Sequence, residues 1–339
     1  MIQAVARKFS RSWVTAELDC RIMRIGIVGA GIAGLACAAR LKDNGIVATL
    51  FDKGRRPGGR LSSLCIGGLE WDFGAQYFKV SGAAFAAEVK RWHDRHLVAP
   101  WTGGPDGALV GMPSMGGFVA ALCQGHDVRL NAEIQRIEAD CLGWHISGPG
   151  LCDGPFAALI IAVPSEQAAT LVSLHDLDMA RETTATRSAP CWTVMTAFAE
   201  PLSALPHYFR DRGPIAWASR NNSKPARAPT ECWVIQASAA WSRAHLERDP
   251  TVVAPLLLSA FAAEARADLP TPSFLRAHRW RFGLPYGQRG KVLWNPSLRL
   301  GACGDWTVAP AIEGAWQSGV ATAQRVVDTL AREQVHAPG

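Results

Sequence analysis

The pattern of apolar and polar residues at the start of the chain predicts a strand, a helix and a second strand. Residues 25–28 form a short apolar run, which is typical of a buried parallel strand. From residue 32 to residue 41 apolar side chains recur at helical spacing, and Asn44 and Gly45 then provide a typical helix end. Residues 47–51 form a second apolar run. We therefore expect an α/β unit with parallel strands at this end of the chain.

The remaining pattern predicts further elements of ordinary length. Helices are expected at 83–96, at 118–123 and from 312 through 326. Strands are expected at 127–131, 133–137, 156–164, 191–198, 232–237 and 300–305. Two of these, 191–198 and 232–237, are rich in β-branched and aromatic residues, which favours a second sheet away from the parallel one.

Composition sets the size and the general class of the protein. The chain has 339 residues, of which 48% are hydrophobic and 19% charged, so we expect an enzyme of two domains. No apolar run approaches the roughly 20 residues that cross a bilayer. The net charge of +6 is mild and spread out, so no nucleic-acid partner is expected. Nine cysteines without a Cys-x-x-Cys pair indicate scattered thiols of a reducing cytoplasm, and no metal-ligand spacing occurs.

The first turn carries the strongest chemical motif. Gly29, Gly31 and Gly34 follow the first strand in Gly-x-Gly-x-x-Gly spacing. Glycine at these places allows a tight turn, a close approach of pyrophosphate to the backbone, and close packing of helix on sheet. The helix start attracts phosphate, and Asp52 at the end of the second strand is placed to accept a hydrogen bond from a ribose hydroxyl. This order of features predicts a dinucleotide site.

A second glycine loop indicates which dinucleotide is bound. The run Arg56-Pro57-Gly58-Gly59-Arg60 lies just beyond Asp52 and resembles the second phosphate-contacting loop of FAD oxidoreductases of the amine-oxidase type. Physically it offers a second backbone approach to the pyrophosphate, to which Arg60 adds charge. The sequence therefore predicts FAD. It is expected to bind noncovalently because no Cys or His lies in a flavinylation motif of that family.

Several later motifs, taken with Gly-Gly-Arg-Leu-Ser-Ser at 58–63, resemble the renalase-like branch of the FAD-dependent amine oxidase superfamily. They are Asp-x-Gly-Ala-Gln-Tyr-Phe at 72–78, Arg-Asn-x-Ser-Lys-Pro at 220–225, Ala-Ser-x-x-Trp-Ser at 237–242, and His-Arg-Trp at 278–280. The resemblance implies that Gly74 and Ala75 lie beside the flavin ring, with Gln76 near its reactive face. It also implies that Ile134 supplies backbone contacts to adenine, although plain core packing remains an alternative for Ile134.

The C-terminal part carries a second FAD motif of the same superfamily. Gly304 and Asp305 close a strand, and Glu313-Gly314-Ala315 opens a helix. The resemblance implies that Asp305 accepts hydrogen bonds from the ribityl chain and that the helix N-terminus faces the flavin. Relatives often carry a basic residue between these motifs, whereas here the link reads Val308-Ala309-Pro310-Ala311. Cys303 is expected to be strand core.

The resemblance implies an α/β fold of p-hydroxybenzoate-hydroxylase and amine-oxidase type. A Rossmann-type FAD domain would be assembled from residues 23–80, 105–165 and 290–335, with an inserted mixed-sheet α+β substrate domain at 81–104 and 166–289. Residues 1–22 have no continuous apolar segment, so we expect a disordered extension and no secretory signal. The sequence leaves open whether the protein is a monomer or a homodimer.

The residues expected to bind FAD are Gly29, Gly31, Ile32, Ala33, Gly34, Asp52, Lys53, Gly59, Arg60, Gly74, Ala75, Gln76, Ile134, Gly304, Asp305, Glu313, Gly314 and Ala315. Those expected to wall the reactive face are Gln76, His278 and Trp280. No metal site is expected.

Charge bears on the substrate. Residues 271–303 contain six basic side chains and no acidic one, and Arg220 and Lys224 lie on an expected loop of the same domain. The six are Arg276, Arg279, Arg281, Arg289, Lys291 and Arg299. An anionic dinucleotide would favour such cations, whereas a cationic amine would favour carboxylates or an aromatic cage. The alternative is that they are solvated side chains on strand edges.

The resemblance implies a cytoplasmic oxidase that takes hydride from an isomer of NADH or NADPH onto flavin N5 and passes electrons to dioxygen, giving hydrogen peroxide. Two alternatives stay open at this point. One is a flavin-containing amine oxidase, and the other is a non-catalytic FAD-binding redox protein.

Overall fold

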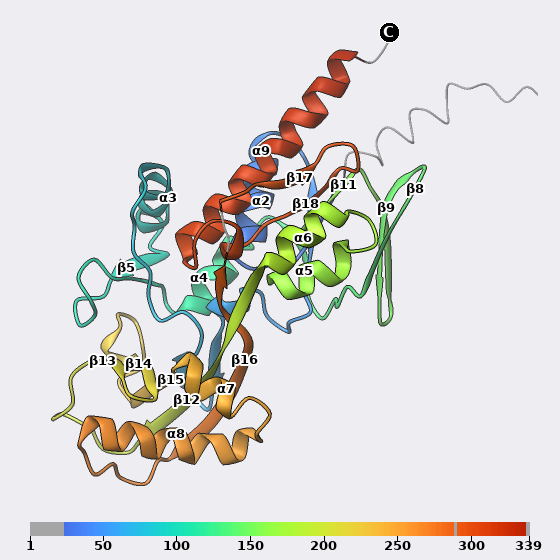
Figure 1. Ribbon diagram of the computed structural model, residues 1–339. Coiled ribbons are helices and arrows are strands. Elements are labelled where there is room, and N and C mark those ends of the chain that lie inside the picture. The colour runs from blue at the N-terminus through green and yellow to red at the C-terminus, as the bar shows by residue number, and fades with distance from the viewer. Residues whose placement is uncertain (1–23, 288–289, 337–339) are drawn as a thin grey trace, which may run out of the picture.

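The computed structural model describes residues 24–287 and 290–336 (Figure 1). The expectation for residues 1–22, and the side chain of Arg289, lie outside the described residues. A six-stranded sheet in the order β17-β18-β11-β1-β2-β7 forms the dinucleotide-binding part. Its two central strands are β1 (Ile25–Val28) and β11 (Ala158–Ile161), and β2 (Ala48–Phe51) lies on the other side of β1. These three strands are parallel, which confirms the expected α/β unit.

The outer strands of this sheet come from distant parts of the chain. They are β7 (Asp127–Arg129), β18 (Leu300–Ala302) and β17 (Leu293–Asn295). Because β17 runs antiparallel to β18, this sheet is mixed. Strands β1, β2, β11 and β18 are fully buried because helices pack on both faces of the sheet, whereas β7 at one edge is mostly exposed.

Two helices at the centre of Figure 1 position the cofactor motifs. Helix α2 (Ile32–Asp43) follows β1 as expected, and helix α9 (Ile312–His336) crosses it. The crossing is close because a Cβ on Gly319 of α9 would lie 2.0 Å from the carbonyl oxygen of Ala33. Apolar side chains of both helices, among them Leu41 and Val326, are buried in one cluster. The two helix N-termini are thereby fixed relative to each other.

A second, five-stranded sheet forms the lower half of Figure 1, in the order β13-β14-β15-β12-β16. All its pairings are antiparallel. The mixed sheet of the molecule is the six-stranded sheet described above. Its strands are β12 (Thr186–Phe198), β13 (Tyr208–Arg212), β14 (Ile215–Arg220), β15 (Glu231–Ala237) and β16 (Phe274–Gly287). Helices α7 (Ala239–Ala244) and α8 (Pro250–Ala265) follow β15, and α8 covers one face through Val253, Leu257 and Phe261.

The other face of this antiparallel sheet lies against a hairpin of β3 (Ser63–Ile66) and β4 (Leu69–Asp72). Trp71 of β4 is fully buried there and donates its indole N–H to the carbonyl of Thr196, at 3.0 Å. The hairpin directly precedes the Asp72–Gln76 segment. The hairpin therefore connects the antiparallel sheet to the Asp72–Gln76 segment.

The remaining elements are short. They are helices α3 (Ala83–Asp94), α4 (Met115–Leu122), α5 (Ser165–Val172) and α6 (Leu177–Ala185), strands β5 (Val98–Pro100) and β6 (Leu109–Gly111), and a small sheet of β8 (Arg136–Asp140), β9 (Gly143–Gly148) and β10 (Leu151–Phe156). Several boundaries differ from expectation, and two of them show why. Helix α4 begins three residues early because Ser114 caps it by accepting from the N–H of Gly117. The strand expected at 133–137 begins only at Arg136, where pairing with β9 starts.

Candidate functional site

The first glycine turn is built as the dinucleotide motif requires. Gly29 has a φ of +111°, and a Cβ there would lie 2.4 Å from the carbonyl oxygen of Ala162. A Cβ on Gly34 would lie 2.0 Å from the carbonyl oxygen of Gly29. Neither position has room for a side chain, so these two glycines fix the turn and the close seating of α2 on β1.

Two other glycines face open space. A Cβ on Gly31, at the start of α2, or on Gly59, in the second glycine loop, would meet no atom within 4 Å. The two loops are joined by a hydrogen bond from the N–H of Gly58 to the carbonyl of Ala30, at 3.0 Å. No acidic residue lies in the first turn of α2. The bare backbone beside a helix N-terminus therefore fits a pyrophosphate.

Asp52 lies at the end of β2, where the sequence places it. Its carboxylate accepts hydrogen bonds from the N–H groups of Ala30 (2.8 Å) and Gly54 (2.7 Å). A carboxylate can accept about four such bonds, so Asp52 keeps capacity for a ribose hydroxyl. Lys53 beside it is exposed. The ribose contact of Asp52 and any contact from Lys53 stay predictions.

The two FAD motifs meet in one ion pair. The guanidinium of Arg60 donates from Nη1 and Nη2 to the two carboxylate oxygens of Asp305, at 2.8 and 2.6 Å. Nη1 also donates to the carbonyl oxygen of Gly283 in β16, at 2.9 Å. Arg60 therefore joins both cofactor motifs to the antiparallel sheet.

The Asp72–Gln76 segment is packed between the cofactor motif and that sheet. The N–H of Ala75 donates to the carbonyl of Arg60 at 2.8 Å, and a Cβ on Gly74 would lie 2.0 Å from the same oxygen. On its other side, the carbonyl of Gly74 accepts from Nε2 of Gln236 in β15, at 2.7 Å. Glycine is required at position 74 because the backbone of Arg60 leaves no room for a side chain.

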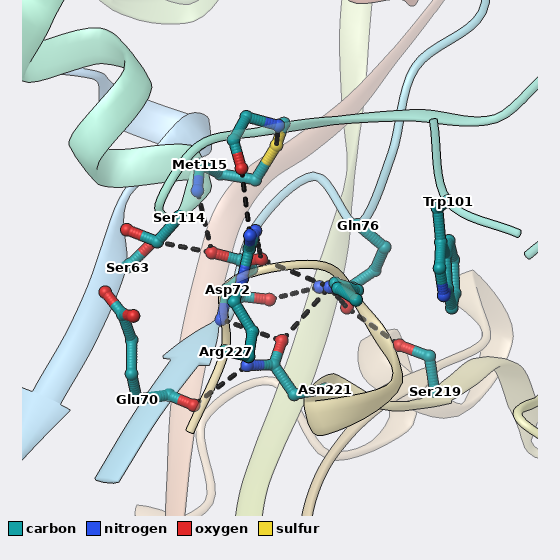
Figure 2. Close-up of polar contacts among 12 residues, drawn as sticks. Ser63, Glu70, Asp72, Gln76, Trp101, Ser114, Met115, Ser219, Asn221 and Arg227 are labelled. Atoms are coloured by element: carbon teal, nitrogen blue, oxygen red, sulfur yellow. Dashed lines mark hydrogen bonds and ion pairs between the residues drawn. The ribbon is translucent and has the colours of Figure 1, made fainter. Parts of the chain in front are cut away.

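Gln76 is buried, and protein groups occupy its amide (Figure 2). Its Nε2 donates to the carbonyls of Asp72 and Gly74. Its Oε1 accepts from the hydroxyl of Ser219 (2.9 Å) and from Nζ of Lys224 (3.1 Å). All its donors and two acceptor positions are used, so Gln76 holds this segment in place. Its expected contact with substrate stays a prediction.

A buried charge cluster contacts the side-chain amide of Gln76 through Lys224. Nζ of Lys224 and Nη2 of Arg227 lie 3.3 and 2.6 Å from Oδ2 of Asp72, and the three side chains are at most 1% exposed. Oδ1 of Asp72 accepts from the hydroxyl of Ser63 (2.7 Å) and the N–H of Met115 (2.9 Å) (Figure 2). Hydrogen bonds thus satisfy the carboxylate, as a buried charge requires.

This cluster shifts the ionisation of its members. Burial alone would raise the pKa of Asp72, but the charges of Lys224 and Arg227 outweigh it and hold that pKa well below its ordinary value. Burial lowers the pKa of Lys224 to about 8, against the opposing attraction of Asp72. Nζ of Lys224 also lies 3.1 Å from Oδ1 of Asn221 and 5.6 Å from the ring centroid of Trp101. Lys224 therefore titrates near physiological pH.

The expected wall residues His278 and Trp280 lie together on β16, and the structure adds Phe73 to them. The Phe73 ring stacks on Trp280 with centroids 5.1 Å apart, and His278 meets both rings at 4.9 and 4.4 Å. The indole of Trp280 donates to the carbonyl of Phe73 at 3.1 Å. Burial, and then the charge of Arg276, lower the pKa of His278 to about 4, so its ring is neutral at pH 7.

A second aromatic group lies on the other side of Gln76. Its members are Tyr77, Trp101, Tyr208 and Trp217, with ring centroids 5.0 to 6.4 Å apart. Trp217 is 7% exposed, and its indole N–H is buried without an acceptor among the described residues. The sequence did not indicate this group because its members come from four separate segments.

The start of α9 is tied to the same region. The carboxylate of Glu313 accepts from the N–H groups of Ser81 (2.8 Å) and Gly82 (2.7 Å). A Cβ on Gly314 would lie 2.2 Å from the carbonyl oxygen of Ala309. Ala315 is buried. The Glu313 carboxylate therefore anchors the chain that follows the Asp72–Gln76 segment.

Other residues named from sequence fall as follows. Ile134 lies outside a strand and packs against a buried apolar cluster that includes Phe51 and Trp144. Burial raises the pKa of the Cys303 thiol to about 12, and Cys303 belongs to the core as expected. Arg227 was not identified from sequence. It lies two residues beyond the end of the Arg-Asn-x-Ser-Lys-Pro motif, where no local pattern distinguishes it from other loop residues.

Most of the noted cations have protein partners. Arg279 and Arg281 pair with Glu247, Lys291 pairs with Glu182, Arg299 pairs with Glu333, and Arg220 pairs with Glu231. Within residues 24–287 and 290–336, Arg276 makes no ion pair. Few of these cations therefore remain as candidates to bind a substrate phosphate.

Comparison with known proteins gives a family-model match for an NAD(P)-binding Rossmann-like domain over residues 27–95. The chain is similar to protoporphyrinogen oxidase 2 of Arabidopsis thaliana, at 48% identity over 52 residues, which are 15% of this chain and 10% of that protein. It is also 39% identical over 83 residues to a 4,4'-diapophytoene desaturase of Staphylococcus haemolyticus, covering 24% of this chain and 17% of the desaturase. The similarity thus spans less than a fifth of the length of these relatives.

Similarity to solved structures extends over the whole fold. A protein of Exiguobacterium sp. 255-15, assigned as a protoporphyrinogen oxidase, has a TM-score of 0.72 at 12% identity, covering 91% of this chain and 99% of that one. Cyclohexylamine oxidase of Brevibacterium oxydans has a TM-score of 0.69 at 12% identity, covering 91% and 100%. The chain therefore shares the fold of these proteins, with a Rossmann-like domain matched at residues 27–95. Its cofactor and reaction are taken up below.

Two further properties concern the described part of the chain only. No helix there is long and apolar enough to cross a membrane. No group of three or more His, Cys, Asp or Glu side chains in the same residues is arranged to hold a metal ion.

Proposed function

We propose that the chain is a renalase-like FAD-dependent oxidase whose hydride donor is an isomeric dihydronicotinamide dinucleotide. The observation that carries the FAD site is the Arg60–Asp305 pair, which joins two motifs from opposite ends of the chain beside the open glycine backbone of Gly31 and Gly59. The renalase-like branch is supported by the Arg-Asn-x-Ser-Lys-Pro element. That element supplies Asn221 and Lys224 to the polar network around Gln76.

When bound, FAD would supply a two-electron acceptor for hydride from the donor carbon, with NAD(P)⁺ as product, and reoxidation by dioxygen and two protons would give hydrogen peroxide. The chain contributes binding, orientation and exclusion of water. Gly29, Gly31 and Gly59 provide the diphosphate seat, and Arg60 and Asp305 link it to the antiparallel sheet. Phe73 and Trp280 stack on each other and His278 meets both rings edge-on, so this group offers aromatic contacts to a planar donor ring.

Hydride transfer from a dihydronicotinamide needs no protein base, because no proton leaves the donor carbon. This agrees with the ionisable groups near the Asp72–Gln76 segment. His278 is neutral at pH 7 and packed between aromatic rings, and Asp72 is held ionised by two cations. The neutral imidazole also places no positive charge beside the pyridinium product.

An amine oxidase is the second candidate, because solved structures of similar fold include a cyclohexylamine oxidase and a putrescine oxidase. An amine donor would have to bind near the aromatic group of Tyr77, Trp101, Tyr208 and Trp217. The neighbouring buried cluster carries more positive than negative charge, which disfavours a cationic amine there.

Anaerobic stopped-flow mixing separates the candidates. The FAD-loaded protein is mixed with dihydronicotinamide isomers and, separately, with primary and secondary amines, and the flavin absorbance is followed. Fast bleaching by a dihydronicotinamide, with NAD(P)⁺ as product, is the expected result. Bleaching by amines alone would replace the proposal with the amine oxidase. Bleaching by neither would leave a flavoprotein without this oxidase activity.

A further inference from the structure

The buried cluster of Asp72, Lys224 and Arg227 holds two cations but one anion. Among the residues that the structure describes, Asp72 is the only carboxylate within ion-pair distance of either cation. Arg227 gives its other hydrogen bonds to the carbonyls of Gly111 (2.9 Å) and Pro225 (2.8 Å), and its buried Nε has no acceptor there. With all three groups ionised, the cluster therefore has a net charge of +1.

An uncompensated buried charge is costly, by several kcal/mol after relaxation. Its position shows where a balancing anion would act. The cluster is one residue from Phe73 and two from Gly74, and Gly74 packs directly on the backbone of Arg60 in the cofactor motif. Lys224 also contacts Gln76 at the far end of the same segment. The positive charge therefore lies next to the Asp72–Gln76 segment, which is expected to pass beside the flavin.

We propose that Lys224 and Arg227 act as a fixed counter-charge for negative charge that accumulates on the bound flavin. This inference rests on the proposed FAD site. The two side chains are positioning residues, because they act across the Asp72–Gln76 segment and their polar contacts are with protein. The consequence is a flavin that accepts electrons more readily than it would beside a neutral cluster.

Asn221 provides a test that changes charge with little change in shape. Its Oδ1 lies 3.1 Å from Nζ of Lys224, so N221D adds a carboxylate oxygen to the cluster and brings its net charge to zero. Asn222 is next in the same turn and bonds outward to Pro229 and Glu231, so N222D adds the same charge outside the cluster. The pair forms a matched comparison. Lys224→Met removes the positive charge at this position, and Lys224→Arg keeps it.

The probe is sulfite, which adds through sulfur to oxidised flavin; a nitrogen–sulfur bond forms, the ring takes up the electron pair and becomes negatively charged, and the visible absorbance bleaches. We expect N221D and K224M to weaken sulfite binding about tenfold, the order expected for one unit charge in the protein interior. We expect K224R to stay within about twofold of the parent protein because it keeps the cluster charge. We expect the same of N222D because its added charge lies outside the cluster, at a half-buried side chain where solvent screens it. The melting temperature of each FAD-loaded variant is recorded alongside.

Equal sulfite affinity in the parent, N221D and K224M would overturn the inference and show that the cluster is only a structural clamp. So would a loss in N222D as large as that in N221D. If K224M fails to fold, the N221D and N222D comparison still decides. Failure of the whole chain to bind FAD would instead defeat the proposed function, so the two failures are distinguishable.

Discussion

Arg60 and Asp305 are 245 positions apart in the chain, yet they form a two-pronged ion pair with N–O distances of 2.8 and 2.6 Å. Each belongs to a different FAD motif, and the Arg60 side chain also reaches the antiparallel sheet through Gly283. The pair is only partly buried, so its contribution to stability is smaller than its geometry suggests. Its importance lies in joining two motifs that the sequence analysis assigns to one cofactor.

Arg60→Met is expected to weaken FAD binding without unfolding the protein. Arg60 is expected to add charge beside the pyrophosphate, and one charge-assisted hydrogen bond contributes about 1.5–3 kcal/mol, so we expect the dissociation constant of FAD to rise about tenfold when the side chain is lost. Fluorescence titration of the apoprotein measures this. Arg299→Met is the control, because Arg299 forms a comparable pair with Glu333 away from the motifs. FAD affinity that is equal in both variants would show that the Arg60 pair has no role in the site.

The glycines of the first motif should respond differently to alanine. A Cβ on Gly31 has space and the backbone there is extended, with φ of −78°, so G31A is expected to fold normally but to lose FAD affinity. A Cβ on Gly34 would strike the carbonyl of Gly29, so G34A is expected to lower the melting temperature of the apoprotein itself. Thermal melts and FAD titrations of both variants check this. Unchanged FAD affinity in G31A would contradict the phosphate seat.

Asp72→Asn should destabilise the protein by about 3–5 kcal/mol at pH 7, because it leaves two buried cations without a counterion. The folded-state pKa of Asp72 lies below its unfolded value, so its stabilisation is present above pH 4 and lost as pH falls further. Urea unfolding at several pH values should show the variant and parent converging below about pH 4. A difference that is independent of pH would disprove the ionised state of Asp72.

Lys224 predicts a pH effect on the flavin. Its pKa of about 8 means that the cluster has its extra charge below pH 8 and loses it above. The charged groups that face it are Asp72 from β4 and Arg227 from its own loop, and Asp72 stays ionised in this range because its pKa is held well below its ordinary value. The midpoint potential of bound FAD should therefore exceed that of K224M below pH 8 and approach it above pH 8. Dye-equilibrated reduction at pH 6.5 to 9.5 measures this, and parallel curves would be the contrary result.

His278 should titrate far below an ordinary histidine. Its folded-state pKa of about 4 lies under the unfolded value of about 6.5, so protonation opposes folding as pH falls between these values. Proton NMR of the imidazole would show a midpoint near pH 4 and none near 6.5. The causes are burial of the imidazole, which packs against Phe73 and Trp280, and then the charge of Arg276. A midpoint near 6.5 would mean that the aromatic surface is open to solvent.

The sequence predicted the parts of the fold whose cause is local. Gly29 and Gly34 tolerate no side chain, and their spacing is therefore readable without a structure. The cluster around Asp72 is different, because β4, η2 (Asn221–Ser223) and the loop that carries Arg227 meet only through tertiary packing. Arg227 has no local pattern to mark it. Gln76 illustrates the intermediate case, since its motif was recognised but the saturation of its amide by Ser219 and Lys224 was not.

Helix and strand ends were predicted less well for similar reasons. Ser114 lies in a glycine-rich loop, and only the structure shows that its hydroxyl accepts from Gly117 and starts α4 early. The strand at 133–137 was shifted because its register depends on β9, to which Arg136 and not Glu133 is paired. Such boundaries depend on partners distant in sequence, and hydrophobic periodicity does not encode them.

The most direct test of the account is an equilibrium titration of the full-length apoprotein with FAD, followed by visible absorbance and by the stoichiometry of flavin retained after gel filtration. We predict one FAD per chain, bound noncovalently and released on denaturation, with binding weakened by both G31A and R60M. A chain that remains colourless and takes up no added FAD would contradict the central claim.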